Sequence, residues 1–107
     1  GDGRPASLSP AAVQLELRQK LGFDGVVVTD DIQMESALAG RSLGEAIVLA
    51  LAAGNDIVLI ANMLAYQPDV ARYALAAIRR AVADGRLDRD ALIRSYKRVI
   101  ALKQRLR

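Results

Sequence analysis

The chain has 107 residues, a formal net charge of +3 and a hydrophobic fraction of 52%, which suits one domain with an aliphatic core. It contains no cysteine and no histidine, which excludes disulfides and thiolate metal sites and removes the commonest general base. The longest apolar stretches fall far short of the ~20 residues of a membrane span, so we expect a soluble chain without a membrane partner.

The first half of the chain predicts a helix followed by a strand. Ser9 and Pro10 are typical of a helix start, and Gly22 is typical of a helix end. The run Gly25–Thr29 is continuously apolar after its glycine, which predicts a parallel strand buried on both faces. A loop over residues 30–41 is expected to follow.

A second helix and strand come next. Ser42 and Glu45 form the pattern of a capping box, and Gly54 is placed to end the helix. The helix is apolar nearly all round, so we expect it to be covered on more than one side. Asp56–Ile60 predicts a second buried strand, and Asn62–Gln67 a loop.

Two helices complete the predicted order α-β-α-β-α-α. The first spans Pro68–Ala83 and ends at Gly85, and the second is capped by Asp88. Its expected apolar stripe contains Leu92, Ile93, Tyr96, Val99, Ile100 and Leu106. Residues 86–107 also contain eight Lys or Arg against two Asp. With no aromatic interleaving and no nucleic-acid motif, we assign these cations to a solvated helix face and expect no nucleic-acid partner.

Two parallel strands joined by a helix form one right-handed crossover unit of the α/β class. One such unit is marginal on its own even when helices cover it, because both outer strand edges stay unpaired. The chain is therefore expected either to be part of a larger sheet or to self-associate so that a copy completes the sheet.

The segment Leu21–Met34 contains the strongest functional signal, because a buried strand ends at the adjacent carboxylates Asp30 and Asp31. Ligands bind at the carboxyl ends of parallel strands, so acids there are candidates for chemistry. Two other interpretations remain for the acid pair. Asp pairs commonly form turns after strands, and two acids can hold Mg²⁺, although further ligands for a metal site are not evident.

The segment resembles the signature of glycoside hydrolase family 3, and it is most similar to the β-N-acetylhexosaminidase branch found in bacteria. The resemblance extends along essentially the whole chain, in order and at the family's spacing. It is found at Pro5–Pro10, Leu17-Arg18, Leu21–Gly25, Thr29–Ile32, Met34, Ala53–Asp56, Ser95, Arg98-Val99 and Leu102-Lys103.

The resemblance implies roles for three residues. Asp30 takes the place of the family's nucleophile, which forms a covalent glycosyl ester in a retaining mechanism. Met34 would line the sugar site as an apolar wall, although it also suits a core position. Asp31 would be a substrate-site residue that orients the loop or caps the turn. No metal and no organic cofactor is implied, and the substrate would be a carbohydrate with terminal β-linked N-acetylglucosamine.

The family fold is a (β/α)8 TIM barrel of about 250 residues, so residues 1–107 would be a C-terminal segment with the last two strands and their helices. The resemblance also places an aspartate–histidine acid/base pair on an earlier loop, and this chain contains no histidine. We therefore expect that the chain alone does not hydrolyse glycosides. The alternative is a non-catalytic, self-assembling α/β unit. Relatives include cytoplasmic and exported forms, so no compartment is predicted.

Overall fold

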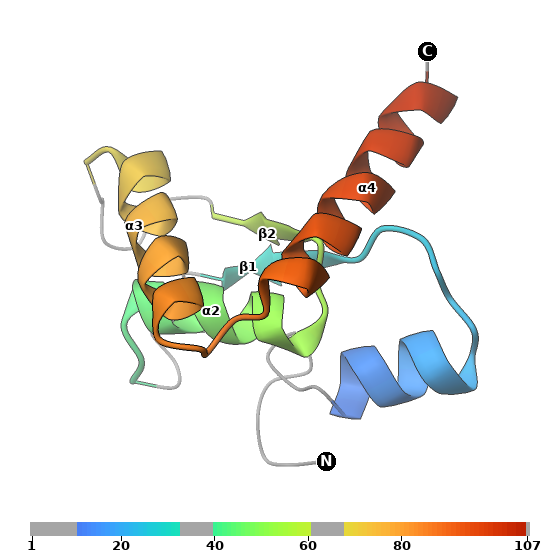
Figure 1. Cartoon of the computed structure of the whole chain (residues 1–107), viewed down its shortest axis with the longest axis horizontal. Helices are drawn as coiled ribbons and strands as arrows, with labels where there is room; N and C mark the ends of the chain where they lie inside the picture. The colour runs from blue at the N-terminus through green and yellow to red at the C-terminus, as the bar shows by residue number, and fades with distance from the viewer. Residues whose placement is uncertain (1–10, 33–39, 61–67, 107) are drawn as a thin grey trace.

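The computed structural model describes residues 11–32, 40–60 and 68–106. The predictions for Ser9, Pro10 and the loop Asn62–Gln67 lie outside these residues. The described elements are the π-type helix η2 (Ala11–Lys20), strand β1 (Val28–Asp31), helix α2 (Leu43–Ala53), strand β2 (Ile57–Leu59), and helices α3 (Val70–Ala83) and α4 (Arg89–Arg105). In Figure 1 the two strands lie above α2, with α3 and α4 on either side of them. Within the described ranges, no helix combines the length and apolarity needed to cross a bilayer.

The two strands pair in parallel, with Val28 opposite Ile57 and Asp31 opposite Leu59. Both are shorter than the predicted strands, which were Gly25–Thr29 and Asp56–Ile60, and β1 begins later and includes both acids. The Val27 carbonyl accepts hydrogen bonds from the N–H groups of Asp56 at 2.8 Å and Ile57 at 3.1 Å. The two segments therefore meet just before β1 begins.

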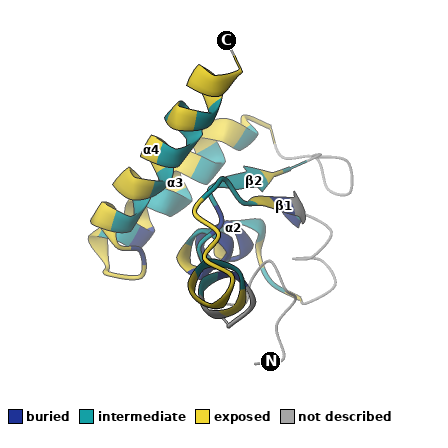
Figure 2. Cartoon of the chain, turned by 90° about the vertical axis from the view of Figure 1, so that its right-hand side faces the viewer, coloured by how far each residue is buried: buried dark blue, intermediate teal, exposed yellow. Residues whose placement is uncertain are grey.

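The predicted burial of both strand faces is wrong. Val28 is 52% exposed and Leu59 is 51% exposed. Val58 and Ile60 pack against the core cluster formed with α2, so Leu59, which lies between them in an alternating strand, projects to the opposite side. The sheet is thus covered by α2 on one face and is open to solvent at these two residues on the other, as the colours of Figure 2 show along the strands.

Helix α2 begins and ends where the sequence predicts. The Ser42 hydroxyl accepts a hydrogen bond from the Glu45 N–H at 3.1 Å, which is the Ser42 half of the expected capping box. At the other end Gly54 has φ +113°, a backbone conformation that side chains disfavour. The expected cover on more than one side is also found. One buried cluster joins Ala46, Ile47 and Ala50 of α2 to Ile32, which directly follows β1. A second cluster joins Val48 of α2 to Ala81 of α3 and to Leu87, which follows α3.

The last two helices are exposed to different extents. Helix α3 packs on α2, whereas α4 contains no buried residue. Asp88 caps α4 as predicted, accepting from the Asp90 N–H at 3.3 Å. Half of the predicted apolar stripe of α4 is exposed, namely Ile93, Tyr96 and Leu106, and the other half, Leu92, Val99 and Ile100, is partly buried. The chain is therefore a helical α/β structure with a small parallel sheet and an incompletely covered surface.

Candidate functional site

The acid pair lies in strand β1, whose last two residues are Asp30 and Asp31. The structure describes the backbone of Asp30 but not its side chain, and Met34 lies outside the described residues. Asp31 is partly buried and makes an interaction of its own, and its Cα pairs with that of Leu59. Both acids therefore sit at the carboxyl end of a parallel strand, the position from which α/β proteins present ligand-binding groups.

An irregularity of the strand pairing falls between Val28 and Asp31, the stretch that contains Asp30. Between the two paired positions β1 advances from Val28 to Asp31 while β2 advances from Ile57 to Leu59. One extra residue is therefore accommodated on β1 beside Asp30, which is the arrangement of a β-bulge. Bulges re-aim the side chains next to them and are common beside active sites.

Thr29 anchors this irregular segment. Its side chain is buried, and its hydroxyl accepts a hydrogen bond from the Leu59 N–H at 2.9 Å. The bond takes the place of a backbone partner where the ladder is interrupted, so the Leu59 N–H is satisfied despite the bulge. Thr29 thus holds the backbone of its neighbour Asp30 against β2.

A second carboxylate forms the densest polar cluster of the described residues, at the amino end of β2. The Asp56 side chain is fully buried and accepts four hydrogen bonds. The donors are the guanidinium of Arg18 at 2.7 Å, the Val27 N–H at 3.0 Å, the Ser95 hydroxyl at 2.5 Å and the guanidinium of Arg98 at 2.9 Å. We call Asp56, Arg18, Ser95 and Arg98 the Asp56 cluster.

With its backbone partners, the Asp56 cluster joins four segments of the chain, which are η2, the segment before β1, the turn between α2 and β2, and α4. Arg18 comes from η2, and Ser95 and Arg98 come from α4. Arg18 also donates to the carbonyl oxygens of Gly25 at 3.0 Å and Gly54 at 2.9 Å. Its Nε has no hydrogen-bond partner among the described atoms. Because one carboxylate and two guanidiniums bridge helices and strands here, the cluster serves to hold η2 and α4 to the sheet.

The sequence-based interpretation missed this cluster. The sequence predicts Asp56 as the first residue of the second strand and indicates no partner for its carboxylate, although Arg18, Ser95 and Arg98 all fall at positions that carry the family resemblance. The available signal was an acid immediately before an apolar strand together with two arginines on flanking helices. A buried carboxylate has to be paired, so an acid at the start of a buried strand indicates such a partner.

The acidic residues at the two ends of the sheet differ in whether they can take part in chemistry. The Asp56 carboxylate is saturated by four donors and closed to solvent, so it has no room for a substrate atom. Asp30 and Asp31 lie at the opposite end of the strands. Across the described ranges no group of three His, Cys, Asp or Glu residues is arranged to hold a metal ion.

Known proteins provide a direct comparison for this geometry. The family described as "Glycosyl hydrolase family 3 N terminal domain" matches residues 1–102. A protein named "Beta-hexosaminidase" from Methylobacillus flagellatus is 41% identical over 78 residues, which are 73% of this chain and 21% of that protein. A secreted glycosyl hydrolase from Arthroderma benhamiae, described as uncharacterized, is 36% identical over 95% of this chain and 28% of its own length.

Solved structures show the same relationship. The glycoside hydrolase family 3 β-N-acetylglucosaminidase from Paenibacillus superposes with a TM-score of 0.83 at 38% identity, covering 97% of this chain and 19% of that one. The chain thus spans about a fifth of the length of these relatives. Since the family match extends over nearly all of its residues, the chain belongs to glycosyl hydrolase family 3.

Proposed function

We propose that residues 1–107 form the C-terminal segment of a (β/α)8 catalytic barrel, with β1 and β2 as its last two strands. The whole protein would be a retaining glycosidase acting on terminal β-linked N-acetylglucosamine, with Asp30 as its nucleophile. The observation that carries this proposal is the position of Asp30, near the carboxyl end of a parallel strand and within its irregularly paired stretch. The membership of family 3 and the names of the relatives support it.

In the proposed reaction the Asp30 carboxylate attacks the anomeric carbon while the bond to the leaving oxygen breaks. A separate acid gives its proton to that oxygen, and the same group then takes a proton from the water that hydrolyses the glycosyl ester. The chain has no histidine for the aspartate–histidine pair that the family resemblance implies. We therefore infer that this second group comes from outside residues 1–107 and that the isolated chain is inactive.

The exposed face of the sheet supports the placement in a barrel. In a (β/α)8 barrel one face of each strand meets helices and the other meets the packed interior. Here α2 covers the face of Val58, and the opposite face leaves Val28 and Leu59 about half exposed. Strands from the remainder of a barrel would bury that face. Completion by a second copy of the chain stays an alternative, and gel filtration of the isolated chain would detect it as a defined oligomer.

A chimera provides the test of catalysis. Residues 1–107 would replace the matching segment of the Paenibacillus relative, which aligns with 97% of this chain and supplies the rest of the protein. We expect the chimera to hydrolyse 4-nitrophenyl N-acetyl-β-glucosaminide and the isolated chain to show no turnover. Asp30→Asn should lower kcat by about 10³-fold or more, since a barrier increase of about 4 kcal/mol corresponds to that factor.

Two controls sharpen this experiment. Asp24→Asn makes the same chemical change at an exposed carboxylate before the strand and should leave kcat within about twofold of the chimera, a difference of about 0.4 kcal/mol. A 5-fluoro glycosyl fluoride of N-acetylglucosamine should label the peptide that contains Asp30, detected by mass spectrometry. Parent-like turnover by the Asp30→Asn chimera would refute the assignment. Turnover by the isolated chain that Asp30→Asn abolishes would refute its predicted inactivity.

A further inference from the structure

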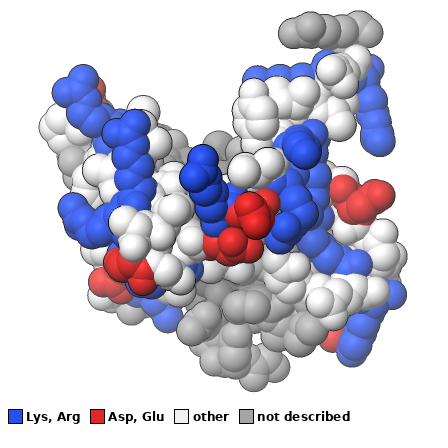
Figure 3. All heavy atoms as spheres, viewed as in Figure 1, with Lys and Arg blue, Asp and Glu red and all other residues white. Residues whose placement is uncertain are grey.

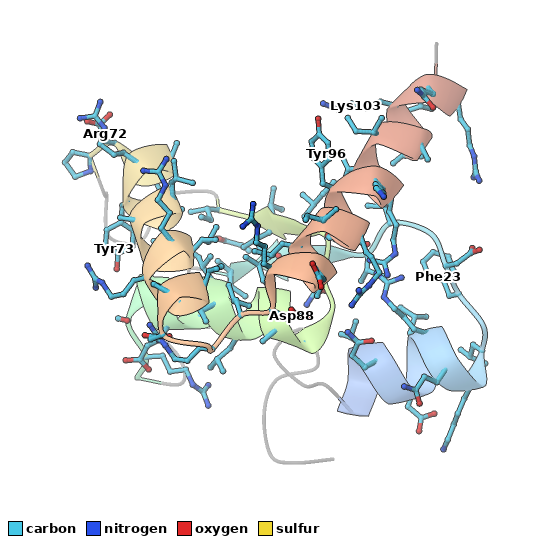
Figure 4. All side chains as sticks on the ribbon, viewed as in Figure 1. Phe23, Arg72, Tyr73, Asp88, Tyr96 and Lys103 are labelled. Atoms are coloured by element: carbon cyan, nitrogen blue, oxygen red, sulfur yellow. The ribbon has the colours of Figure 1, made fainter. Side chains whose placement is uncertain are left out.

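A groove of about 440 Å³ lies on the side of the molecule where α4 passes the segment that leads into β1. One wall is formed by the segment Phe23–Val26. The other is formed by α4, with Arg94, Lys97, Arg98 and Arg105. In Figure 4, Phe23 lies on the η2 side of α4, whereas Tyr96 projects from the side of α4 that faces α3. The groove is thus separate from the carboxyl end of β1, where Asp30 lies.

The groove is strongly cationic. Residues 94, 97, 98 and 105 fall within an arc of about 100° on a helix of 3.6 residues per turn, so they form one stripe about 16 Å long. The lining contains one carboxylate, Asp24, against these four cations. In the space-filling view of Figure 3, Lys and Arg side chains gather along α4.

Part of this charge is available to a ligand. Arg98 is bound to Asp56, and the contact of Arg94 with Asp88 is long, at 4.0 Å, between largely exposed side chains. The ion pairs formed by the described residues include neither Lys97 nor Arg105, and both are exposed. Two cations about 12 Å apart along the helix axis, at about 1.5 Å per residue, are therefore open to anionic groups repeated along an extended ligand.

Phe23 adds an apolar surface beside these cations. Its ring is positioned over Gly25, where an added Cβ would approach the ring Cζ to 2.7 Å, and Phe23 remains 42% exposed. Sequence-independent binding of single-stranded nucleic acid uses successive aromatic rings on which neighbouring bases stack. Phe23 is the single aromatic among the residues that line the groove. One ring among several cations instead fits a sugar polymer, in which one ring packs on the aromatic face and acidic groups meet the cations.

We propose that this groove binds an anionic polysaccharide, a sugar chain that carries carboxylates. The choice of a glycan rests on the glycosidase function proposed above, while the choice of an anionic ligand rests on the charges of the groove. Binding here would be independent of the sugar site at Asp30.

The experiment measures binding of a fluorescent decamer of galacturonate to the 107-residue chain by anisotropy at low salt. The fully methyl-esterified decamer has the same length without charge and is the ligand control. Lys97→Gln/Arg105→Gln should weaken binding of the acidic decamer about tenfold, equivalent to about 1.4 kcal/mol. Arg72→Gln/Arg79→Gln removes the same charge from exposed positions of α3 and should leave the Kd within about twofold, about 0.4 kcal/mol.

Further variants separate the effect of charge on binding from the effects of misfolding and of ring stacking. Lys97→Arg/Arg105→Lys keeps both charges and should bind as the parent does, and equal circular dichroism spectra verify folding. Phe23→Leu should weaken binding without changing its dependence on salt. Equal losses of affinity in the α3 and α4 double variants, or no binding of the acidic decamer at all, would refute binding at this groove. Equal or tighter binding of a DNA decamer, dT10, would overturn the glycan assignment. Because no hydrolysis is measured, an inactive chimera and a failure to bind are separate results.

Discussion

The Asp56 cluster makes a sharp prediction about stability. Asp56→Asn keeps the shape of the side chain but removes its charge and replaces one acceptor oxygen by a donor. In place of Oδ2 that donor would face the donors of Arg18 and the Val27 backbone, and in place of Oδ1 those of Ser95 and Arg98. Removing one partner of a buried ion pair typically costs about 3–5 kcal/mol, because the remaining charge stays buried.

The burial of the two arginines sets where the cost falls in this range. The Arg18 side chain is 9% exposed and keeps almost no access to water, whereas that of Arg98 is 28% exposed and regains part of its hydration. We therefore expect a loss near the lower limit, about 3 kcal/mol. With a urea slope of about 1.5 kcal/mol/M, the unfolding midpoint should fall by about 2 M. Domains are stable by only about 5–15 kcal/mol, so this is a large fraction of the total.

The assay is urea unfolding followed by circular dichroism, with Asp84→Asn as the matched control. Asp84 also pairs with an arginine, Arg86, at 2.9 Å, but both side chains are about half exposed. Surface pairs contribute little, so the control should leave the midpoint nearly unchanged. Equal midpoints for the two variants would refute the view that burial makes the Asp56 carboxylate important.

A double-mutant cycle tests the pairing itself. Arg18→Met in the Asp56→Asn background should cost less than Arg18→Met alone, by about 1–3 kcal/mol, because residues in contact are coupled. The two changes would be additive if Arg18 were held mainly by its carbonyl partners, Gly25 and Gly54, rather than by the carboxylate.

Three further predictions concern local features. Gly54→Ala should lower Tm by about 5–10 °C, because φ +113° disfavours a side chain and the new Cβ would lie 2.6 Å from Gln14 Nε2. Ser42→Ala should cost about 1 kcal/mol through the lost cap of α2, measured by urea unfolding, whereas Ser42→Asp should not. The hydrogen bond from Arg86 lowers the pKa of Asp84 below 3.8, so its small stabilisation is present above that pH and disappears as the pH falls through the lowered pKa. Midpoints of the parent and Asp84→Asn should therefore converge in acid.

Local signals in the sequence were sufficient to predict α2. Ser42 and Gly54 act through their own backbone neighbours, so the ends of this helix could be read without knowing the rest of the fold. The strands depend on a partner. The apolar run of β1 begins before its pairing does, and a run of valines contains no signal for the residue at which a ladder starts.

The Asp56 cluster shows what the sequence leaves open. The partners of Asp56 lie 38 residues before it and 39 and 42 residues after it, so their contact depends on the packing of η2 and α4. The acid pair of β1 stood out because both residues are adjacent in the chain and follow an apolar run. Its catalytic role stays a prediction, and the irregular pairing between Val28 and Asp31 was not foreseen, because a bulge is a property of two strands together.

The positions of the two acidic sites connect stability with the proposed chemistry. The Asp56 carboxylate accepts from the Val27 N–H, and the Val27 carbonyl accepts from the Asp56 N–H, so the two strands are fixed to one another at their amino ends. A slip of one residue would reverse the faces of β1 and move Asp30 to the other side of the sheet. A register fixed at the amino end therefore determines where Asp30 lies at the carboxyl end. In the chimera, a variant of the Asp56 cluster that remains folded should lower kcat through the position of Asp30, although the cluster lies at the opposite end of the strands.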